Sequence, residues 1–214
     1  MAESASKDRA AAIAVPFVGE SPLARFGLAD RAVAAADRSG VFVRERAFLG
    51  HLNLRGSLDD PLFVSAVQSA IGVAPPAMPN TFVEVNDAAV CWLGPDEWLV
   101  LCPGERRAEI EQALRTALAG VRCAVTDVTG GQTVIVLGGD AARDVIAKGC
   151  PLDLHPREFD VGRCAQSRLA KAPILIRQLD REPTYEIVVR RSFADYLWTW
   201  LEDAAAEYGL AVIA

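Results

Sequence analysis

Residues 127–155 read DVTGGQTVIVLGGDAARDVIAKGCPLDLH, and the architecture of the chain can be worked out from them. Thr133 to Leu137 form a continuous apolar run rich in β-branched residues, which predicts a buried strand. Two glycines end this strand, and Asp140 follows as the expected N-cap of a short helix. Gly149 is expected to adopt a left-handed conformation just after that helix. The predicted unit is a strand, a glycine turn and a helix whose apolar face consists of Ala142, Val145 and Ile146.

The same unit is predicted earlier in the chain, in residues 51–72. Leu52 and Leu54 alternate with polar residues, as in a half-buried strand. Asp59 or Asp60 is then the expected N-cap of a helix, with Pro61 at the first helical position, where proline fits. The repetition of one unit indicates an internal duplication.

Residues 92–114 and 177–201 form a second matching pair. Each of them reads as a strand, an acidic turn, a strand and a longer amphipathic helix. The two pairs predict an α+β fold with two related halves of strand–strand–helix units, in which antiparallel sheets carry helices packed on one face. We expect an N-terminal arm over residues 1–21, a first α+β half over 22–120 and a second over 121–214, with the halves forming one compact unit.

The composition excludes several classes of protein. The net charge is −6 and no basic cluster occurs, which argues against nucleic acid as a partner. No window of eighteen apolar residues is present, so we expect no membrane span. The five cysteines are widely spaced and form no CxxC pair, which argues against a disulfide framework or a structural zinc site. These features favour a protein of the reducing cytoplasm.

The residue pattern provides no recognisable catalytic, cofactor or metal site. The glycines at 138 and 139 lack the third glycine of a dinucleotide-binding loop. His51 is expected to point outward from its strand, and His155 lies about a hundred residues away, so the two make a poor metal site. No histidine stands at motif spacing from the candidate hydroxyl nucleophiles, which are Thr129, Ser167 and Ser192. We therefore predict no catalytic, cofactor-binding or metal-binding residue on this chain.

Three runs of the sequence together resemble one known family. They are LGPDEWLVL at 93–101, DVTGGQTVIVLGGDAARDVIAKGCPLDLHP at 127–156 and YEIVVRRSFADYLWTWL at 185–201. The runs and their spacing resemble the gamma subunit of heterotetrameric sarcosine oxidase over residues from about 21 to 208. That family is itself similar to the folate-binding fold of aminomethyltransferase, the T-protein of the glycine cleavage system.

The resemblance implies a role inside a complex of four different subunits. Such a complex is an oxidoreductase that demethylates sarcosine to glycine, yielding hydrogen peroxide and either formaldehyde or methylenetetrahydrofolate. FAD, FMN and NAD are expected on or between the alpha and beta subunits, tetrahydrofolate on alpha, and zinc on delta. This chain would be a non-catalytic structural subunit with alpha, beta and delta as partners. The substrate is left open between sarcosine and a related N-methyl amino acid.

An alternative function for the chain depends on Asp153. In the T-protein fold a catalytic aspartate follows the equivalent strand, turn and helix, and a short polar residue precedes it. Here Asp153 lies between Leu152 and Leu154, so it departs from that pattern. We expect a structural cap or hydrogen-bond acceptor. The alternative is a free-standing folate-binding aminomethyltransferase-like protein with Asp153 as acid/base, and a third possibility is a scaffold in another amine-oxidising complex.

The last predicted helix runs from Ser192 to Tyr208. Its expected core stripe consists of Phe193, Leu197, Trp200, Leu201, Ala204 and Tyr208. Trp198 falls outside this stripe. It is interpreted either as a flanking residue covered by a neighbouring loop or as an anchor for a partner chain.

Overall fold

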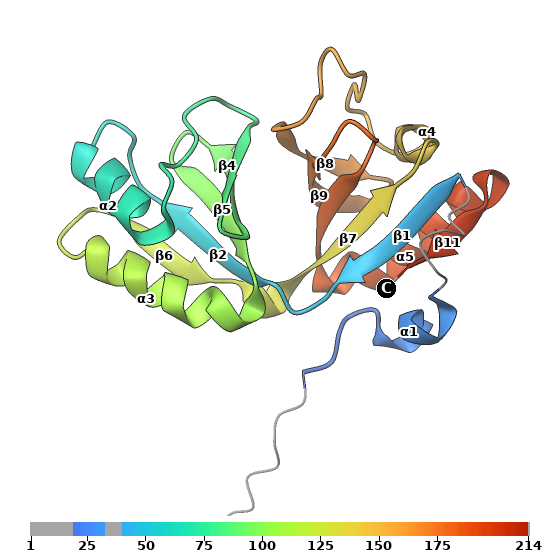
Figure 1. Ribbon diagram of the computed structural model, residues 1–214, viewed down its shortest axis with the longest axis horizontal. Helices are drawn as coiled ribbons and strands as arrows, with labels where there is room; N and C mark the ends of the chain where they lie inside the picture. Colours follow the sequence, from blue (N-terminus) through green and yellow to red (C-terminus); the bar gives the residue numbers. More distant parts are fainter. Residues whose placement is uncertain (1–18, 33–39, 214) are drawn as a thin grey trace, which may run out of the picture.

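Two β-sheets with helices on their outer sides make up the protein (Figure 1). The computed structural model describes residues 19–32 and 40–213, so most of the predicted arm over 1–21 lies outside the described residues. Within the described part, no helix combines the length and apolar character needed to cross a membrane. The segment before the first sheet strand contains two short helical turns, η1 (Ala24–Phe26) and α1 (Leu28–Arg31).

Of the described strands, the first and the last five form one sheet, and the five between them form the other. The six-stranded sheet has the order β11 (Leu210–Val212), β1 (Val41–Arg46), β7 (Gln132–Gly138), β10 (Tyr185–Arg190), β9 (Ala172–Gln178) and β8 (Cys164–Leu169). The five-stranded sheet has the order β3 (Phe82–Val85), β4 (Ala88–Gly94), β5 (Glu97–Cys102), β2 (Gly50–Arg55) and β6 (Ala124–Asp127). All pairings are antiparallel except that of β11 with β1, which is parallel.

Helices α2 (Pro61–Ile71), α3 (Arg107–Ala117), α4 (Ala142–Ala147) and α5 (Arg191–Ala205) pack against the sheets. Helices α2 and α3, the latter preceded by the turn η3 (Gly104–Arg106), cover the five-stranded sheet. The six-stranded sheet carries α4 and α5, and α5 continues as the turn η5 (Ala206–Tyr208). The predicted α+β fold with antiparallel sheets and helices on one face is thereby confirmed.

Both sheets have the same strand order, as an internal duplication requires. The succession β3, β4, β5, β2, β6 in one sheet corresponds to β8, β9, β10, β7, β1 in the other. The first strand of each sequence half is exchanged, because β1 lies in the sheet of the second half and β6 in the sheet of the first. Figure 1 shows the chain passing between the sheets from β1 to β2 and again from β6 to β7. The two sheets are therefore not coextensive with residues 22–120 and 121–214.

The halves also meet at a symmetric junction where β3 and β8 begin. Phe82 N–H donates to Gly162 O at 3.0 Å, and Cys164 N–H donates to Asn80 O at the same distance. Asn80 and Gly162 both have a positive φ, of 58° and 85°. Equivalent residues of the two halves thus make reciprocal bonds, as expected for a pseudo-twofold relation.

The side chains of each sheet alternate between two cores. One face of each sheet packs on its own helices, and the other faces the opposite sheet. The inter-sheet core brings together residues of both sheets, namely Phe82, Ala89, Cys91, Leu99, Leu101, Val134, Cys164, Leu175 and Val188. Because both faces of most strands are covered, an alternation of apolar and polar residues along a strand does not show which face is exposed to solvent.

The helix caps were predicted with mixed success. Of the two predicted candidates, Asp60 caps α2 by accepting a hydrogen bond from Leu62 N–H at 2.9 Å. The prediction for Asp140 was wrong, because Ala141 is the N-cap of α4 and no side chain bonds there. Gly149 does not have a positive φ. A glycine is needed there for another reason, because a Cβ atom would lie 2.7 Å from Cζ2 of Trp200.

Trp198 corrects the predicted orientation of α5. Its side chain is 0% exposed and belongs to the core, and its ring packs on Phe26 with the centroids 5.9 Å apart. Trp200 is half-buried instead of central. The true buried stripe of α5 is Ala194, Leu197, Trp198, Leu201, Ala204 and Ala205. The interface interpretation of Trp198 is therefore wrong, since the N-terminal segment with Leu23 and Phe26 already covers it.

Candidate functional site

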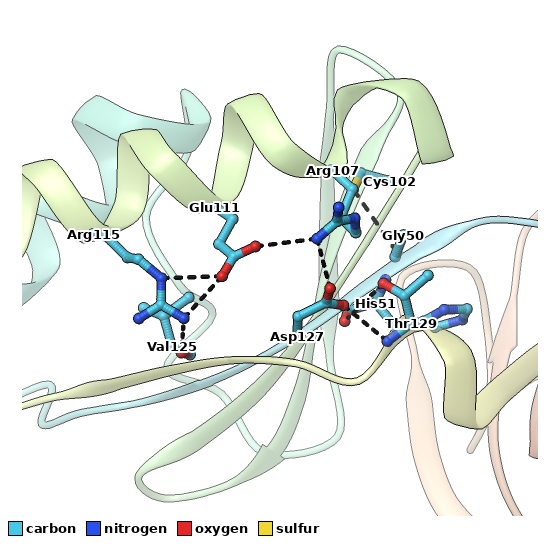
Figure 2. A network of polar contacts seen from close by, with 9 residues as sticks. All are labelled: Gly50, His51, Cys102, Arg107, Glu111, Arg115, Val125, Asp127 and Thr129. Atoms are coloured by element: carbon cyan, nitrogen blue, oxygen red, sulfur yellow. Dashed lines mark hydrogen bonds and ion pairs between the residues drawn. The ribbon is translucent and has the colours of Figure 1, made fainter. Parts of the chain in front are cut away.

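A network of polar contacts lies at the point where β6 leads into β7 (Figure 2). Arg107, on α3, places Nη1 at 2.5 Å from Asp127 Oδ2 and at 3.1 Å from Glu111 Oε2. Arg115, one turn beyond Glu111 on α3, donates to Glu111 Oε1 and also to the carbonyl of Val125, both at 2.8 Å. The network ties α3 to the edge strand β6, and each of its carboxylates already has a cationic partner.

Asp127 also organises the turn η4 (Thr129–Gly131) that connects the sheets. Its Oδ1 accepts the Thr129 N–H at 3.0 Å, while Thr129 Oγ1 accepts the His51 N–H at 3.0 Å. Burial opposes the ionisation of Asp127, but the hydrogen bonds from Thr129 and the charge of Arg107 outweigh it and lower the pKa of this carboxyl. Asp127 is thus held as a carboxylate with structural partners, which does not suit a general acid.

His51 is buried between the sheets, contrary to the outward position predicted for it. Its side chain is 1% exposed, because the face of β2 opposite α2 and α3 is covered by the other sheet. Burial lowers the pKa of His51 to about 4, against weaker opposing effects of the Leu49 backbone and of Asp127 and Glu186. Neither ring nitrogen has a hydrogen-bond partner in the described part of the chain. The imidazole is therefore neutral at pH 7.

Asp153 and His155 lie together in an exposed loop. Asp153 Oδ1 accepts the His155 N–H at 2.9 Å, and His155 Nδ1 accepts the Arg157 N–H at 3.2 Å. These bonds are local turn contacts, of the kind expected for Asp153 as a structural hydrogen-bond acceptor. Neither side chain lines any of the pockets described below.

The hydroxyl candidates are not brought to a histidine imidazole. The Thr129 hydroxyl contacts His51 at its backbone N–H and carbonyl and not at its imidazole. Ser167 contacts the thiol of Cys150 at 3.7 Å, and Ser192 lies exposed in the first turn of α5. The described residues contain no group of three or more metal-ligating side chains.

Sequence reasoning missed a buried ionic network at one end of the inter-sheet core. Arg177 is 2% exposed and Glu186 is 0% exposed; the two are cross-strand neighbours on β9 and β10, with Nη2 and Oε2 at 2.5 Å. Glu186 also pairs with Arg46, and Arg177 pairs with Glu84 of the other sheet at 2.5 Å. Burial alone would lower the pKa of Arg177, but the neighbouring carboxylates raise it. The sequence does hold a sign of this network, because one charged residue interrupts each of two apolar runs. Arg177 does so in β9 and Glu186 in β10.

A pocket of about 350 Å³ opens at the other end of the inter-sheet core. Leu99, Leu175 and Val188 belong to its apolar wall, and they are part of the inter-sheet core. The polar lining comes from Asn53, Glu97, Thr126, Gln132, Gln166 and Arg190. Asn53 Nδ2 already donates to Glu97 Oε1 at 2.8 Å, and Gln166 Nε2 donates to Leu93 O at 2.8 Å. The lining contains no histidine and no cysteine, and it offers hydrogen bonding and apolar contact.

Known proteins identify the family to which this architecture belongs. The profile of the "Sarcosine oxidase, gamma subunit family" matches residues 55–207. The sarcosine oxidase subunit gamma of Corynebacterium sp. strain U-96 is 36% identical over 195 residues, which cover 91% of this chain and 93% of that one. This chain belongs to the sarcosine oxidase gamma subunit family. A sarcosine oxidase subunit gamma from Arthrobacter sp. is 32% identical over 191 residues.

Solved structures agree with this assignment to the gamma subunit family. A chain of the heterotetrameric sarcosine oxidase from Corynebacterium sp. U-96, in complex with pyrrole 2-carboxylate, superimposes with a TM-score of 0.79 at 34% identity. The match covers 92% of this chain and 99% of that chain. The aminomethyltransferase T of the glycine cleavage system from Bartonella henselae gives a TM-score of 0.63 at 14% identity, over 48% of its length. This second likeness shows a shared fold alone.

Proposed function

We propose that this chain is a non-catalytic structural subunit of a heterotetrameric sarcosine oxidase. The observation that carries the proposal is 36% identity to a sarcosine oxidase subunit gamma over 91% of this chain. The geometry supports a structural role. The ionised groups at the crossing between the sheets are paired with one another, and His51 is buried and neutral. Asp153 and His155 make local turn contacts, and the Thr129 hydroxyl bonds His51 only at its backbone.

The proposal extends to the complex as a whole. The complex oxidatively demethylates sarcosine to glycine and yields hydrogen peroxide with formaldehyde or methylenetetrahydrofolate. Its FAD, FMN, NAD, tetrahydrofolate and zinc belong to the partner subunits alpha, beta and delta, and the assembly works in the cytoplasm. The described part of this chain offers paired charges and an amide-lined pocket, which suit packing against other subunits.

A second candidate function rests on the fold shared with the aminomethyltransferase. Under it, the chain would act alone on a folate substrate with Asp153 as acid/base. The contact between Asp153 Oδ1 and the His155 N–H argues for a turn-forming role instead. The two functions make different predictions for a change of this carboxylate.

Asp153→Asn should leave turnover of the assembled complex within a few-fold of the parent. The amide keeps an oxygen that can accept the His155 N–H but cannot exchange a proton, whereas general acid–base groups typically contribute ~10²–10⁴-fold. The measurement is sarcosine-dependent peroxide formation by complex of equal purity, with the neighbouring exposed residue changed by Glu158→Gln as a control. If Asp153→Asn alone lowers turnover by ~10²–10⁴-fold while the complex still assembles, the result would favour the transferase function.

A further inference from the structure

The six-stranded sheet shows how an extended segment adds to one of the exchanged strands. Strand β11 runs parallel to β1, with Val41 opposite Leu210 and Val43 opposite Val212. Val41 N–H donates to Gly209 O at 3.2 Å, and Val43 O accepts the Ile213 N–H at 3.0 Å. The side chains of Leu210 and Val212 pack into the helix-side core. This addition covers the outer edge of β1.

The five-stranded sheet has the equivalent edge without the equivalent strand. Its order ends at β6, which occupies the position that β1 has in the other sheet, and no described strand lies beyond it. Val125 is opposite Leu54 on β2, as Val43 is opposite Leu137 on β7. Leu54 and Leu137 both face the helix-side cores of their sheets. Val125 therefore corresponds to Val43.

The backbone of β6 directs hydrogen-bonding groups to this open edge. Val128 N–H donates to His51 O at 2.9 Å, so His51 and Val128 form a hydrogen-bonded pair of the antiparallel ladder. Since such pairs alternate, Thr126 bonds to β2, and Val125 turns its N–H and carbonyl away from it. The Val125 carbonyl accepts a hydrogen bond from Nη2 of Arg115. At the corresponding position of the other sheet, the Val43 carbonyl accepts a hydrogen bond from the backbone N–H of Ile213. The Arg115 side chain thus takes the place of a strand at one position.

A groove with both polar and apolar lining runs along the same edge. It has a volume of about 420 Å³ and is lined by Arg115, Leu118, Val121, Cys123, Ala124 and Val125. Leu118, Val121, Cys123 and Val125 belong to or pack against the helix-side core of this sheet. The groove therefore lies at the position where, in the six-stranded sheet, the side chains of Leu210 and Val212 pack.

We propose that the edge Cys123–Val125 binds an extended segment of a partner subunit, which adds to β6 in parallel as β11 adds to β1. Such strand addition gives affinity through backbone bonds, and the groove selects apolar side chains at alternate positions. The incoming N–H replaces the Arg115 contact to Val125 O, while Arg115 keeps its ion pair with Glu111. The proposal rests on the proposed function, because it takes the partner from the sarcosine oxidase complex.

Cys123 provides a selective probe of this edge. It is half-buried, whereas Cys91, Cys102, Cys150 and Cys164 are buried, so a bulky maleimide should label it first in the native chain. Burial raises the pKa of Cys123, so mildly alkaline conditions favour its thiolate and speed labelling. Labelled chain should enter the complex with a yield lower by at least about tenfold. The Cys123→Ser chain, treated identically, should assemble like untreated parent.

Hydrogen exchange on the purified complex gives an independent readout. The Val125 amide should exchange rapidly in the free full-length chain and slowly in the complex, while the Thr126 amide should be protected in both. A complex in which Cys123 is labelled freely, or in which the Val125 amide exchanges as fast as in the free chain, overturns the proposal. If the chain instead protects this edge by dimerising without other subunits, a second copy is the occupant and the proposal is wrong. Failure to find any complex refutes the proposed function itself.

Discussion

Trp198→Ala should lower the free energy of unfolding of this chain by about 3–5 kcal/mol, as large-to-small changes in cores do. The side chain is 0% exposed and lies between α5 and the N-terminal segment, against Phe26 and among core residues such as Leu23. Removing it leaves a cavity that the packed surroundings can fill only in part. Since small and medium domains have a total stability of about 5–15 kcal/mol, this is a large fraction of it.

The matched comparison for Trp198 is Tyr196→Ala on the same helix. Tyr196 is 38% exposed, and its hydroxyl accepts the Lys171 N–H at 3.3 Å, so its loss should cost much less. Both variants should be measured by denaturant unfolding followed by far-UV circular dichroism, which does not depend on the altered tryptophan. If Trp198→Ala unfolds like the parent but fails to join the complex, Trp198 is an interface residue after all.

Acidification should destabilise the protein through His51. Its pKa is about 4 in the folded chain and 6.5 in the unfolded chain, so between these values the unfolded state binds more protons. The stability that His51 contributes is complete above pH 6.5 and is lost as the pH falls toward 4. The loss amounts to about 2 kcal/mol at pH 5 and about 3 kcal/mol near pH 4.

The chain provides its own control, because it has two histidines and His155 is exposed. The free energy of unfolding should be measured at pH 7 and pH 5 for the parent, His51→Leu, His51→Gln and His155→Asn. His155→Asn should keep the full difference between the two pH values. Either His51 variant that folds should lose about 2 kcal/mol of it. An unchanged difference in the His51 variants would mean that His51 titrates normally and is not buried as described.

Local sequence signals predicted most of the elements and narrowed the cap of α2 to Asp59 or Asp60. Asp60 and Pro61 act on the first turn of their own helix, so residues nearby in the sequence are sufficient to determine it. The exchange of β1 and β6 could not be predicted in this way. It depends on which sheet a strand joins, and strand periodicity carries no information about its partner.

The errors at Trp198 and His51 have one physical cause. Each was judged from its own helix or strand, and each is covered by a segment distant in the sequence. The turn η1 and Leu23 cover Trp198 from about 170 residues away, and the opposite sheet covers His51. The buried pair Arg177–Glu186 escaped notice for the same reason, because its desolvation arises only when two sheets face each other.

We propose that this chain works as one subunit of a four-chain flavoenzyme. Purification through an affinity tag on this chain from its native cells, followed by electrophoresis and an absorption spectrum, tests the claim most directly. We expect a yellow complex with three further chains that forms hydrogen peroxide from sarcosine, whereas the same chain produced alone binds no FAD or FMN. A colourless single chain that binds folate, or an isolated chain that binds flavin stoichiometrically, would contradict it.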